Sequence, residues 1–296
     1  MTPTHVPVMT AEALSFLLPE RGGVFVDCTV GLGGHARAML EAGAARVIGI
    51  DRDPDALAQS RKTLEPWAAK TDLVHSDYRA IDAVLDGLNV ALVDGALADL
   101  GVSSMQFDEP GRGFSFQRDE PLDMRMDRSA GETAAQLIAS ADERELADTI
   151  YAYGEERFSR RIARAIVTAR RQAPIDTTLR LAAVVRRAMP SRGYQRIDPA
   201  TRTFQALRIR VNRELDGLDV FLGAMAGRLR AGARLVVITF HSLEDRIVKH
   251  TFRALEKSTG AAVKILTKKP VVPGDDEMAR NPRARSAKLR AAERLA

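Results

Sequence analysis

The sequence contains a single cysteine, Cys28, among its 296 residues. One cysteine cannot form an internal disulfide, and it leaves no Cys-x-x-Cys motif for zinc binding or for thiol redox chemistry. The five histidines are scattered and lack the spacing of zinc ligands, so we expect no metal site. A lone cysteine is typical of a reducing compartment, and we predict a cytoplasmic protein.

Long apolar runs are also missing. No window approaches the roughly eighteen consecutive apolar residues of a membrane-spanning helix. The first residues, Met1 to His5, have neither the basic nor the apolar region of a secretory signal, so we expect no membrane partner. Aromatic residues make up only 5% of the chain, which argues against base stacking as the main means of holding a nucleic-acid strand.

Basic residues outnumber acidic ones, 44 to 39, which gives a formal net charge of +5. This surplus is compatible with a polyanionic partner, because each basic side chain that meets a phosphate releases a counterion. Charge alone does not identify such a partner, since many basic proteins bind no nucleic acid. The hydrophobic content of 45% is enough for one large domain or two ordinary ones.

The first hundred residues alternate short apolar runs with helix-forming segments, which is typical of a parallel sheet covered on both faces. The predicted strands are 24–27, 46–51, 73–75 and 90–94, and the helices between them include 36–41 and 54–67. A Gly-, Arg- and Asp-rich stretch at 111–128 leads into helix formers at 133–189, and strand character returns at 234–240. We predict an open α/β sheet with a helical insertion. The polar and basic stretch at 281–290 is expected to order only against the sheet or a ligand.

A glycine-rich loop follows the first predicted strand. Gly31, Gly33 and Gly34 let the backbone turn tightly and pass close to a ligand. Asp51 ends the next strand, where its carboxylate can accept hydrogen bonds from both ribose hydroxyls of an adenosine. His35 would crowd a pyrophosphate more than a methionine moiety, which favours S-adenosylmethionine over a dinucleotide. The alternative is a helix-capping loop with no ligand.

Polar residues follow two further predicted strands. His75-Ser76-Asp77-Tyr78 comes after the third strand, and the segment 94–99 comes after the fourth. Ligands of open α/β sheets bind at the carboxyl ends of strands, so these residues are expected to converge on one crevice. Asp77 and Tyr78 could hold the edge and the face of an adenine, although Tyr78 could equally be an ordinary, partly buried tyrosine.

Several longer motifs occur in a specific order along the chain. They are Asp99–Ser104, Arg112–Phe116, Pro121–Asp127, Tyr153–Phe158, Pro199–Ala206, Phe240–Arg246 and Asn281–Ser286. In these motifs the sequence resembles the RsmH (MraW) family of ribosomal RNA small-subunit methyltransferases. The resemblance implies a Rossmann-like class I methyltransferase domain, formed by residues 1–108 and 212–296. It also implies a mainly helical substrate-recognition domain inserted at 109–211.

The same resemblance implies S-adenosyl-L-methionine as cofactor and N4-methylation of a cytidine in small-subunit (16S) ribosomal RNA near the decoding centre. The RNA would be presented within an assembled small subunit, and the family permits a homodimer. Carried over by motif position, the cofactor contacts are Gly33, Gly34, His35, Asp51, Tyr78, Asp99 and Gln106. Relatives often have phenylalanine at position 78 and proline at position 105, where this chain has Tyr78 and Met105.

Asp99 is also the predicted catalytic residue. The exocyclic amine of cytosine is a poor nucleophile, because its lone pair is shared with the ring. Catalysis then depends on bringing the amine within about 3 to 3.5 Å of the methyl group and on a hydrogen-bond acceptor for the amine. Asp99 would supply that acceptor or hold the amino end of the cofactor; otherwise it caps the next turn.

Three other features leave alternatives open. His241-Ser242 would either position the substrate or cap a helix through Ser242, with Asp245 in its first turn. Phe114 and Phe116 are predicted to stack on a base swung out of its helix. The arginines of the helical region would either hold phosphates or form a solvated helix face. These arginines are at positions 157, 160, 161, 164, 170, 171, 180, 186 and 187.

Two other functions stay open at this point. The glycine loop and Asp51 alone would permit a nicotinamide-dependent oxidoreductase. Such an enzyme needs a catalytic Tyr-x-x-x-Lys or a His and acid pair, and the sequence offers none well placed. A catalytically inactive RNA-binding assembly factor could use the arginine-rich helices, although the intact glycines and acids argue for cofactor binding.

Overall fold

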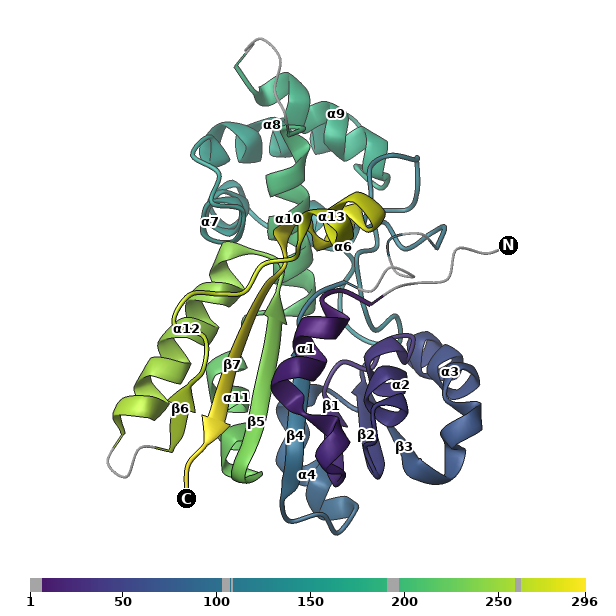
Figure 1. Cartoon of the computed structure of the whole chain (residues 1–296). Coiled ribbons are helices and arrows are strands. Elements are labelled where there is room, and N and C mark those ends of the chain that lie inside the picture. Colours follow the sequence, from purple (N-terminus) through teal and green to yellow (C-terminus); the bar gives the residue numbers. More distant parts are fainter. Residues whose placement is uncertain (1–6, 103–106, 108, 191–196, 259–261) are drawn as a thin grey trace. The chain divides into compact units, whose positions relative to one another are not determined.

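The computed structural model of the chain describes residues 7–102, 107, 109–190, 197–258 and 262–296. The chain divides into two compact units, Met1–Ser103 with Gly217–Ala296 and Ser104–Asp216. We call them the sheet unit and the helical unit; Figure 1 labels their elements. The boundaries between the units lie at 103/104 and 216/217. The sequence predicts them at 108/109 and 211/212.

The described residues of the sheet unit form one seven-stranded sheet in the order β3-β2-β1-β4-β5-β7-β6 (Figure 1). The strands from β3 to β5 in this order are parallel, whereas β7 is antiparallel to both β5 and β6. The bounds are β1 Val24–Asp27, β2 Arg46–Asp51, β3 Thr71–His75, β4 Val93–Asp99, β5 Leu229–Thr239, β6 Val263–Ile265 and β7 Lys288–Arg294. The predicted α/β sheet is confirmed. Its strand order reverses between β1 and β4, where ligands of such sheets bind.

Helices cover both faces of the sheet, because its strands are apolar on both sides. On one face α1 (Thr10–Leu17), α2 (Gly34–Glu41) and α3 (Pro54–Thr63) supply core residues such as Leu17, Met39 and Leu57. On the other face α4 (Ile81–Gly87), α11 (Leu218–Gly227) and α12 (Ser242–Lys257) do the same. Shorter elements are η1 Pro19–Arg21, η2 Glu65–Lys70, η3 Tyr78–Ala80, α13 Asp275–Arg280 and η4 Pro282–Ser286. None of the described helices combines the length and apolarity needed to cross a membrane.

The fourth strand differs from the prediction. The segment 94–99, expected to follow the strand, is the strand itself, because residues 95–98 are almost entirely buried between neighbouring strands. Gly95 leaves room for the ring of Phe25, since a Cβ there would lie 2.6 Å from a ring carbon. Asp94 therefore lies at the start of β4, where its Oδ2 accepts a hydrogen bond from the Val24 N–H at 2.7 Å.

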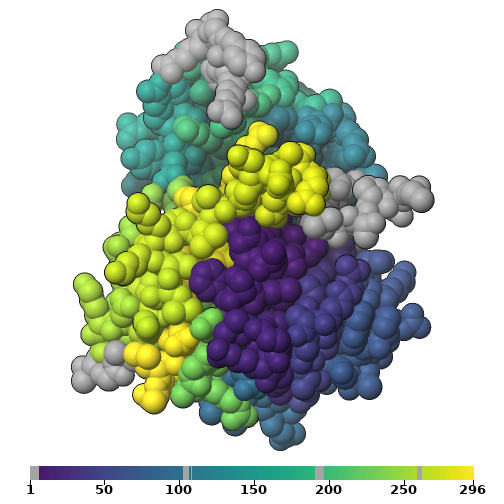
Figure 2. Space-filling model, viewed as in Figure 1, coloured from purple at the N-terminus to yellow at the C-terminus, as the bar shows by residue number. Residues whose placement is uncertain are grey.

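The basic C-terminal stretch is ordered against the sheet. Residues 288–294 form β7, which pairs with β5 and β6, and Ala284 and Leu289 are buried. The N-terminal helix, purple in Figure 2, lies at the surface beside the yellow C-terminal segment. The Met9 N–H donates to the Glu277 carboxylate at 2.7 Å, which ties the two ends of the unit together.

The helical unit consists of α6 (Ala134–Ser140), α7 (Glu143–Gly154), α8 (Ser159–Gln172), α9 (Thr178–Ala188) and α10 (Ala200–Asn212). α10 packs against α6, α7 and α9, and α8 packs against α7 and α9. Start signals in the sequence account for two of the helices: Thr133 forms a capping box with Gln136 at α6, and Asp142 caps α7. The helix-rich region predicted at 133–189 is confirmed.

The Gly-, Arg- and Asp-rich stretch is held by long-range hydrogen bonds rather than by regular structure. Asn212, at the end of α10, accepts from the Met126 N–H and donates to the Met124 carbonyl, both at 2.7 Å. The fully buried Arg112 donates to the Met126 carbonyl at 2.8 Å. Periodicity could not predict this arrangement, because it depends on partners distant in the sequence.

Candidate active site

Three titratable side chains meet at the carboxyl ends of β1 and β4. Asp27 ends β1, Asp99 ends β4, and His35 lies in the first turn of α2. His35 Nε2 lies 3.5 Å from Asp99 Oδ2, an ion-pair distance that is longer than a good hydrogen bond. Asp27 is fully buried and His35 is 6% exposed. The structure thus brings two predicted residues, His35 and Asp99, together with Asp27, which was not predicted as a site residue.

Each of these side chains has a buried polar atom without a hydrogen-bond partner among the described residues. The atoms are Asp27 Oδ2, His35 Nε2 and Asp99 Oδ1. Leaving one buried polar atom unsatisfied costs about 1 to 3 kcal/mol, and such departures concentrate at functional sites. The two carboxylate oxygens fit a ligand that brings N–H donors or positive charge, and both are present in S-adenosylmethionine.

Burial changes the protonation of this cluster. It raises the pKa of Asp27 to about 7, against the attraction of His35 and the hydrogen bond from the Thr29 N–H. Burial alone would lower the pKa of His35, but the neighbouring carboxylates of Asp99, Asp27 and Glu277 outweigh it, so that this pKa is raised. Asp27 therefore holds its proton up to near neutral pH, where an isolated carboxyl group would release it.

We expect the difference in stability between Asp27→Asn and the wild type to shift in favour of the variant when the pH rises from 5 to 8. The folded pKa of about 7 exceeds the ordinary value of 3.8, so the stabilisation from the protonated carboxyl is present at low pH and lost as the pH rises through 7. Asparagine cannot ionise, so the variant's unfolding free energy should gain on the wild type by about 2 to 4 kcal/mol across this interval. Urea unfolding of both proteins at the two pH values measures it. A pH-independent difference contradicts the prediction.

Asp51 holds the glycine loop in the structure. Its Oδ2 accepts from the Gly31 N–H at 2.8 Å, and its Oδ1 accepts from the Asp53 N–H at 2.9 Å. Each oxygen keeps a second lone pair, so the predicted hydrogen bonds to ribose hydroxyls remain compatible with this geometry. Gly31 has φ +51°, and a Cβ there would meet nothing closer than 3.8 Å, which leaves space beside the loop.

Gly33 and Gly34 are required by packing against the protein itself. Gly33 precedes α2 with φ +83°, and a Cβ there would lie 3.2 Å from Leu64. A Cβ on Gly34 would lie 2.9 Å from Pro7. These contacts account for both glycines without a ligand, so their contact with the cofactor stays a prediction.

Tyr78 forms a supported aromatic surface at the end of β3. It begins η3, is half-buried, and its ring centroid lies 4.6 Å from that of Phe221. Burial raises the pKa of Tyr78, so the side chain stays a neutral phenol. The neighbouring Asp77 is already paired with arginines. Burial alone would raise the pKa of Asp77, but Arg79 and Arg52 outweigh it and hold this pKa below its usual value. Asp77 is therefore less suited to an adenine edge than the sequence suggested.

The neighbourhood of Asp99 includes a further positioning contact. The Asp99 N–H donates to the Thr29 hydroxyl at 2.7 Å, which joins the ends of β1 and β4. Neither Thr29 nor Asp27 was predicted as a site residue. The sequence did contain a signal for Asp27, because an acidic residue at the end of an apolar strand is a candidate site residue. Gln106, the last predicted cofactor contact, lies outside the described residues.

His241 is the N-cap of α12, and Ser242 is the first residue of the helix. The Glu244 N–H donates to His241 Nδ1 at 3.4 Å, and Glu244 Oε2 accepts from the Phe240 N–H at 2.9 Å. Asp245 lies in the first turn as expected and binds Arg290 at 2.7 Å. The predicted cap at Ser242 is therefore wrong, because the N-cap is His241, whereas the predicted place of Asp245 in the first turn is confirmed. A role of His241 in positioning the substrate stays a prediction.

The two phenylalanines predicted to stack on a base are engaged within the helical unit. Phe114 is only 6% exposed, so the expectation is wrong for this residue. Phe116 is half-buried, packs edge-on against Phe204 with ring centroids 4.7 Å apart, and has the Arg186 guanidinium over its ring. Stacking of a base on Phe116 stays a prediction.

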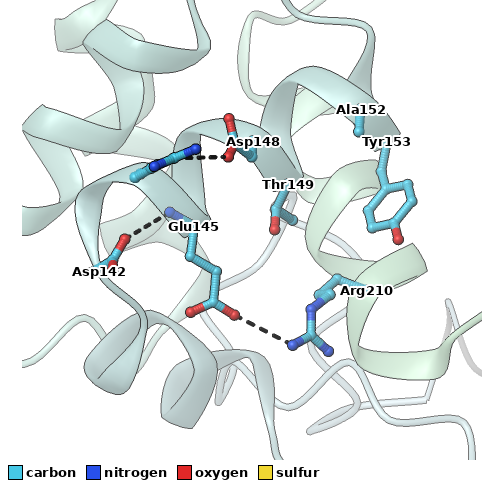
Figure 3. Close-up of a pocket in the computed structure, with 8 residues that line it drawn as sticks. Asp142, Glu145, Asp148, Thr149, Ala152, Tyr153 and Arg210 are labelled. Carbon is cyan, nitrogen blue, oxygen red and sulfur yellow. Dashed lines mark hydrogen bonds and ion pairs between the residues drawn. The ribbon is translucent and has the colours of Figure 1, made fainter.

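The helical unit also contains an open pocket of about 420 Å³ (Figure 3). Its acidic side chains already have partners: Glu145 pairs with Arg210 at 3.3 Å, and Asp148 pairs with Arg144 at 3.8 Å. The carboxylate of Asp142 accepts the Glu145 N–H. No predicted site residue is among those that line the pocket, so it does not belong to the candidate active site.

Comparison with known proteins identifies the family. Residues 2–295 match the model of the MraW methylase family. A protein of Nitrobacter winogradskyi, named ribosomal RNA small subunit methyltransferase H, is 52% identical over 98% of this chain and 90% of its own length. Relatives of the same name in Nitratidesulfovibrio vulgaris and Sorangium cellulosum are 51% and 53% identical, each over 98% of this chain and over 95% and 91% of their own lengths.

Solved structures with a similar arrangement are more distant. An rRNA methylase of Streptococcus thermophilus has 11% identity and a TM-score of 0.44, over 99% of this chain and 100% of its own. An S-adenosylmethionine-dependent O-methyltransferase of Thermotoga maritima has 9% identity and the same TM-score, over 100% of this chain and 69% of its own. The sequence matches carry the assignment and confirm the resemblance seen in the motifs. The chain belongs to the MraW methylase family.

Proposed function

We propose that this methylase transfers the methyl group of S-adenosylmethionine to the N4 amine of a cytidine in small-subunit ribosomal RNA, near the decoding centre. Membership of the family supports methyl transfer, and the shared name of the relatives supports the RNA. The proposal includes the cytoplasm as the place of the reaction and an assembled small subunit as the substrate.

The observation that carries the proposal is the cluster of the buried Asp27 and His35 with the half-buried Asp99 at the reversal of strand order. Its two unpartnered carboxylate oxygens suit a positively charged, N–H-rich ligand, and Asp51 and Tyr78 lie at the ends of the two strands beyond β1. Asp27 would hold the amino-acid end of the cofactor, Asp51 the ribose and Tyr78 the adenine, which leaves Asp99 Oδ1 for the target amine. A catalytically inactive binding factor would have no need of such an uncompensated cluster.

The chemistry follows from this arrangement. S-adenosylmethionine, when bound, would supply an electrophilic methyl group, so no metal or covalent enzyme intermediate is needed. The amine nitrogen would form a bond to the methyl carbon as the bond between that carbon and sulfur breaks, S-adenosylhomocysteine would be the leaving group, and one amine proton would pass to the Asp99 carboxylate. The protein's contribution is to place the target amine and to keep electron density on its nitrogen. Asp99 performs the second task by accepting a hydrogen bond from the amine through Oδ1, while His35 holds the other carboxylate oxygen at 3.5 Å. Thr29 fixes the backbone of Asp99 during this step.

The test is transfer of labelled methyl to small ribosomal subunits purified from cells that lack the enzyme, followed by nuclease digestion and mass spectrometry. We expect one new N4-methylcytidine per subunit. Label at another base would support RNA methylation by this protein but contradict the N4 amine of cytidine as the methylated atom. Absence of label on subunits and on free RNA, with cofactor binding intact, would favour the RNA-binding factor instead.

A further inference from the structure

The helix α8 is strongly divided into an apolar and a basic face. Its residues Ile162, Ala163, Ile166 and Val167 are buried in the helical unit. Arg160, Arg161, Arg164 and Arg171 are all exposed. At 100° per residue these arginines occupy an arc of roughly 100° opposite the buried residues, and at 1.5 Å per residue they extend over about 16 Å. We call these four residues the α8 basic face.

The basic face has little compensating charge. Only Arg164 has an acidic partner among the described residues, the exposed Glu143 at 3.3 Å. Arg160, Arg161 and Arg171 form no ion pair or hydrogen bond with any described residue. Arg170, on the same helix, differs: it turns inward and donates to the carbonyls of Ile138 and Ala141, so its role is structural.

The arginines in the N-terminal half of α8 are unfavourably placed for the helix itself, whereas Arg171 lies in the last turn, where positive charge is favourable. α8 begins with Arg160 and Arg161 in its first turn, has no acidic residue there, and Phe158 provides no side-chain cap. Positive charge at a helix N-terminus opposes the helix dipole by about 0.3 to 1 kcal/mol per residue. Arg160 and Arg164 are also four residues apart, where like charges repel. The preceding helix α7 has the opposite, favourable design, with Asp142 as cap and Glu143 and Glu145 in its first turn.

If the arginines only faced solvent, this unfavourable electrostatic energy would bring no benefit. A bound anionic partner would instead make the same positive charges favourable. We infer that the α8 basic face binds the phosphate backbone of the ribosomal RNA substrate. The inference rests on the proposed function and adds the surface that holds the RNA. Arginine suits this role because its planar guanidinium forms paired hydrogen bonds with phosphate. Such contacts fix the position of the RNA without reading its sequence.

The test removes the four charges together with Arg160→Gln, Arg161→Gln, Arg164→Gln and Arg171→Gln in the full-length protein. The dissociation constant for small subunits is measured from 50 to 300 mM KCl, and methyl transfer is measured alongside. Each lost phosphate contact lowers the slope of log affinity against log salt by about 0.7 to 0.9, so we expect a slope smaller by about 2 to 4. At 100 mM salt the affinity should fall by at least about tenfold. Turnover at saturating subunits should be unchanged, because this binding is equal in ground and transition states.

A matched control replaces four exposed basic residues of the sheet unit by glutamine instead: Arg21, Arg61, Lys62 and Arg253, none of which has an ion pair with another described residue. It changes the net charge by the same amount and should leave the slope near the wild-type value. Equal loss in both variants, or an unchanged slope in the α8 variant, overturns the inference while methyl transfer by the wild type still supports the proposed function. If the wild type neither binds nor methylates subunits, the proposed function fails first and the inference with it.

Discussion

Replacing Asp99 by asparagine is expected to lower the turnover number at saturating cofactor by at least about 100-fold, the usual contribution of a positioned proton acceptor. Asparagine has nearly the same shape and keeps one acceptor oxygen, but it cannot carry the negative charge that strengthens a hydrogen bond from the target amine. Single-turnover methylation of small subunits, with cofactor and subunits both saturating, isolates this step from binding. Near-normal turnover would exclude Asp99 as the acceptor.

A second readout separates this role from a structural one. The carboxylate of Asp99 is the strongest of the attractions that oppose burial and raise the pKa of His35, so this pKa should fall in Asp99→Asn even if the fold is intact. Titration of His35 by NMR measures the shift. The control is Asp94→Asn, the same substitution at the start of the same strand, where the side chain contacts Val24 and Arg230 instead. It should leave both turnover and the His35 titration unchanged.

The strands could be predicted where branched apolar residues end at an acid. β1 and β2 have the expected bounds, because Val-Phe-Val-Asp and Arg-Val-Ile-Gly-Ile-Asp combine strand-forming residues with a clear polar end. β4 could not be placed in this way. Its Gly95, Ala96 and Ala98 have little intrinsic preference for strands, and they are buried only because Phe25 and the neighbouring strands leave no room for larger side chains.

The positions of the candidate site residues along the strands could be predicted one by one, but their clustering could not. The strand-end rule indicated Asp51, Tyr78 and Asp99 correctly as residues that close strands or follow them directly. It could not show that Asp27 and His35 would share a buried space with Asp99, because the spacing between β1 and β4 depends on contacts distant in the sequence. The arginines pose the same problem: only the fold shows that Arg170 turns inward while Arg160 and Arg171 point outward.

Asp51→Asn is expected to weaken cofactor binding rather than turnover. A hydrogen bond to a charged group contributes about 1.5 to 3 kcal/mol, so loss of the carboxylate should raise the dissociation constant of S-adenosylmethionine by roughly 10- to 150-fold. Part of the loss comes through the loop, because the amide nitrogen of asparagine would face an N–H of Gly31 or Asp53 in place of an acceptor. Isothermal titration calorimetry with S-adenosylmethionine measures the change.

The contrast with Asp99 makes the two assignments testable together. If Asp51 binds only the ribose, excess cofactor should restore turnover in Asp51→Asn to near the wild-type value, whereas it should not rescue Asp99→Asn. Asp72→Asn is the control, since Asp72 lies near the amino end of β3 and pairs with Arg46 at 2.6 Å, away from the carboxyl ends of the strands. Unchanged affinity in Asp51→Asn would remove Asp51 from the cofactor site and leave it the role of holding the glycine loop. A turnover defect that excess cofactor does not relieve would instead place Asp51 in the same functional unit as Asp99.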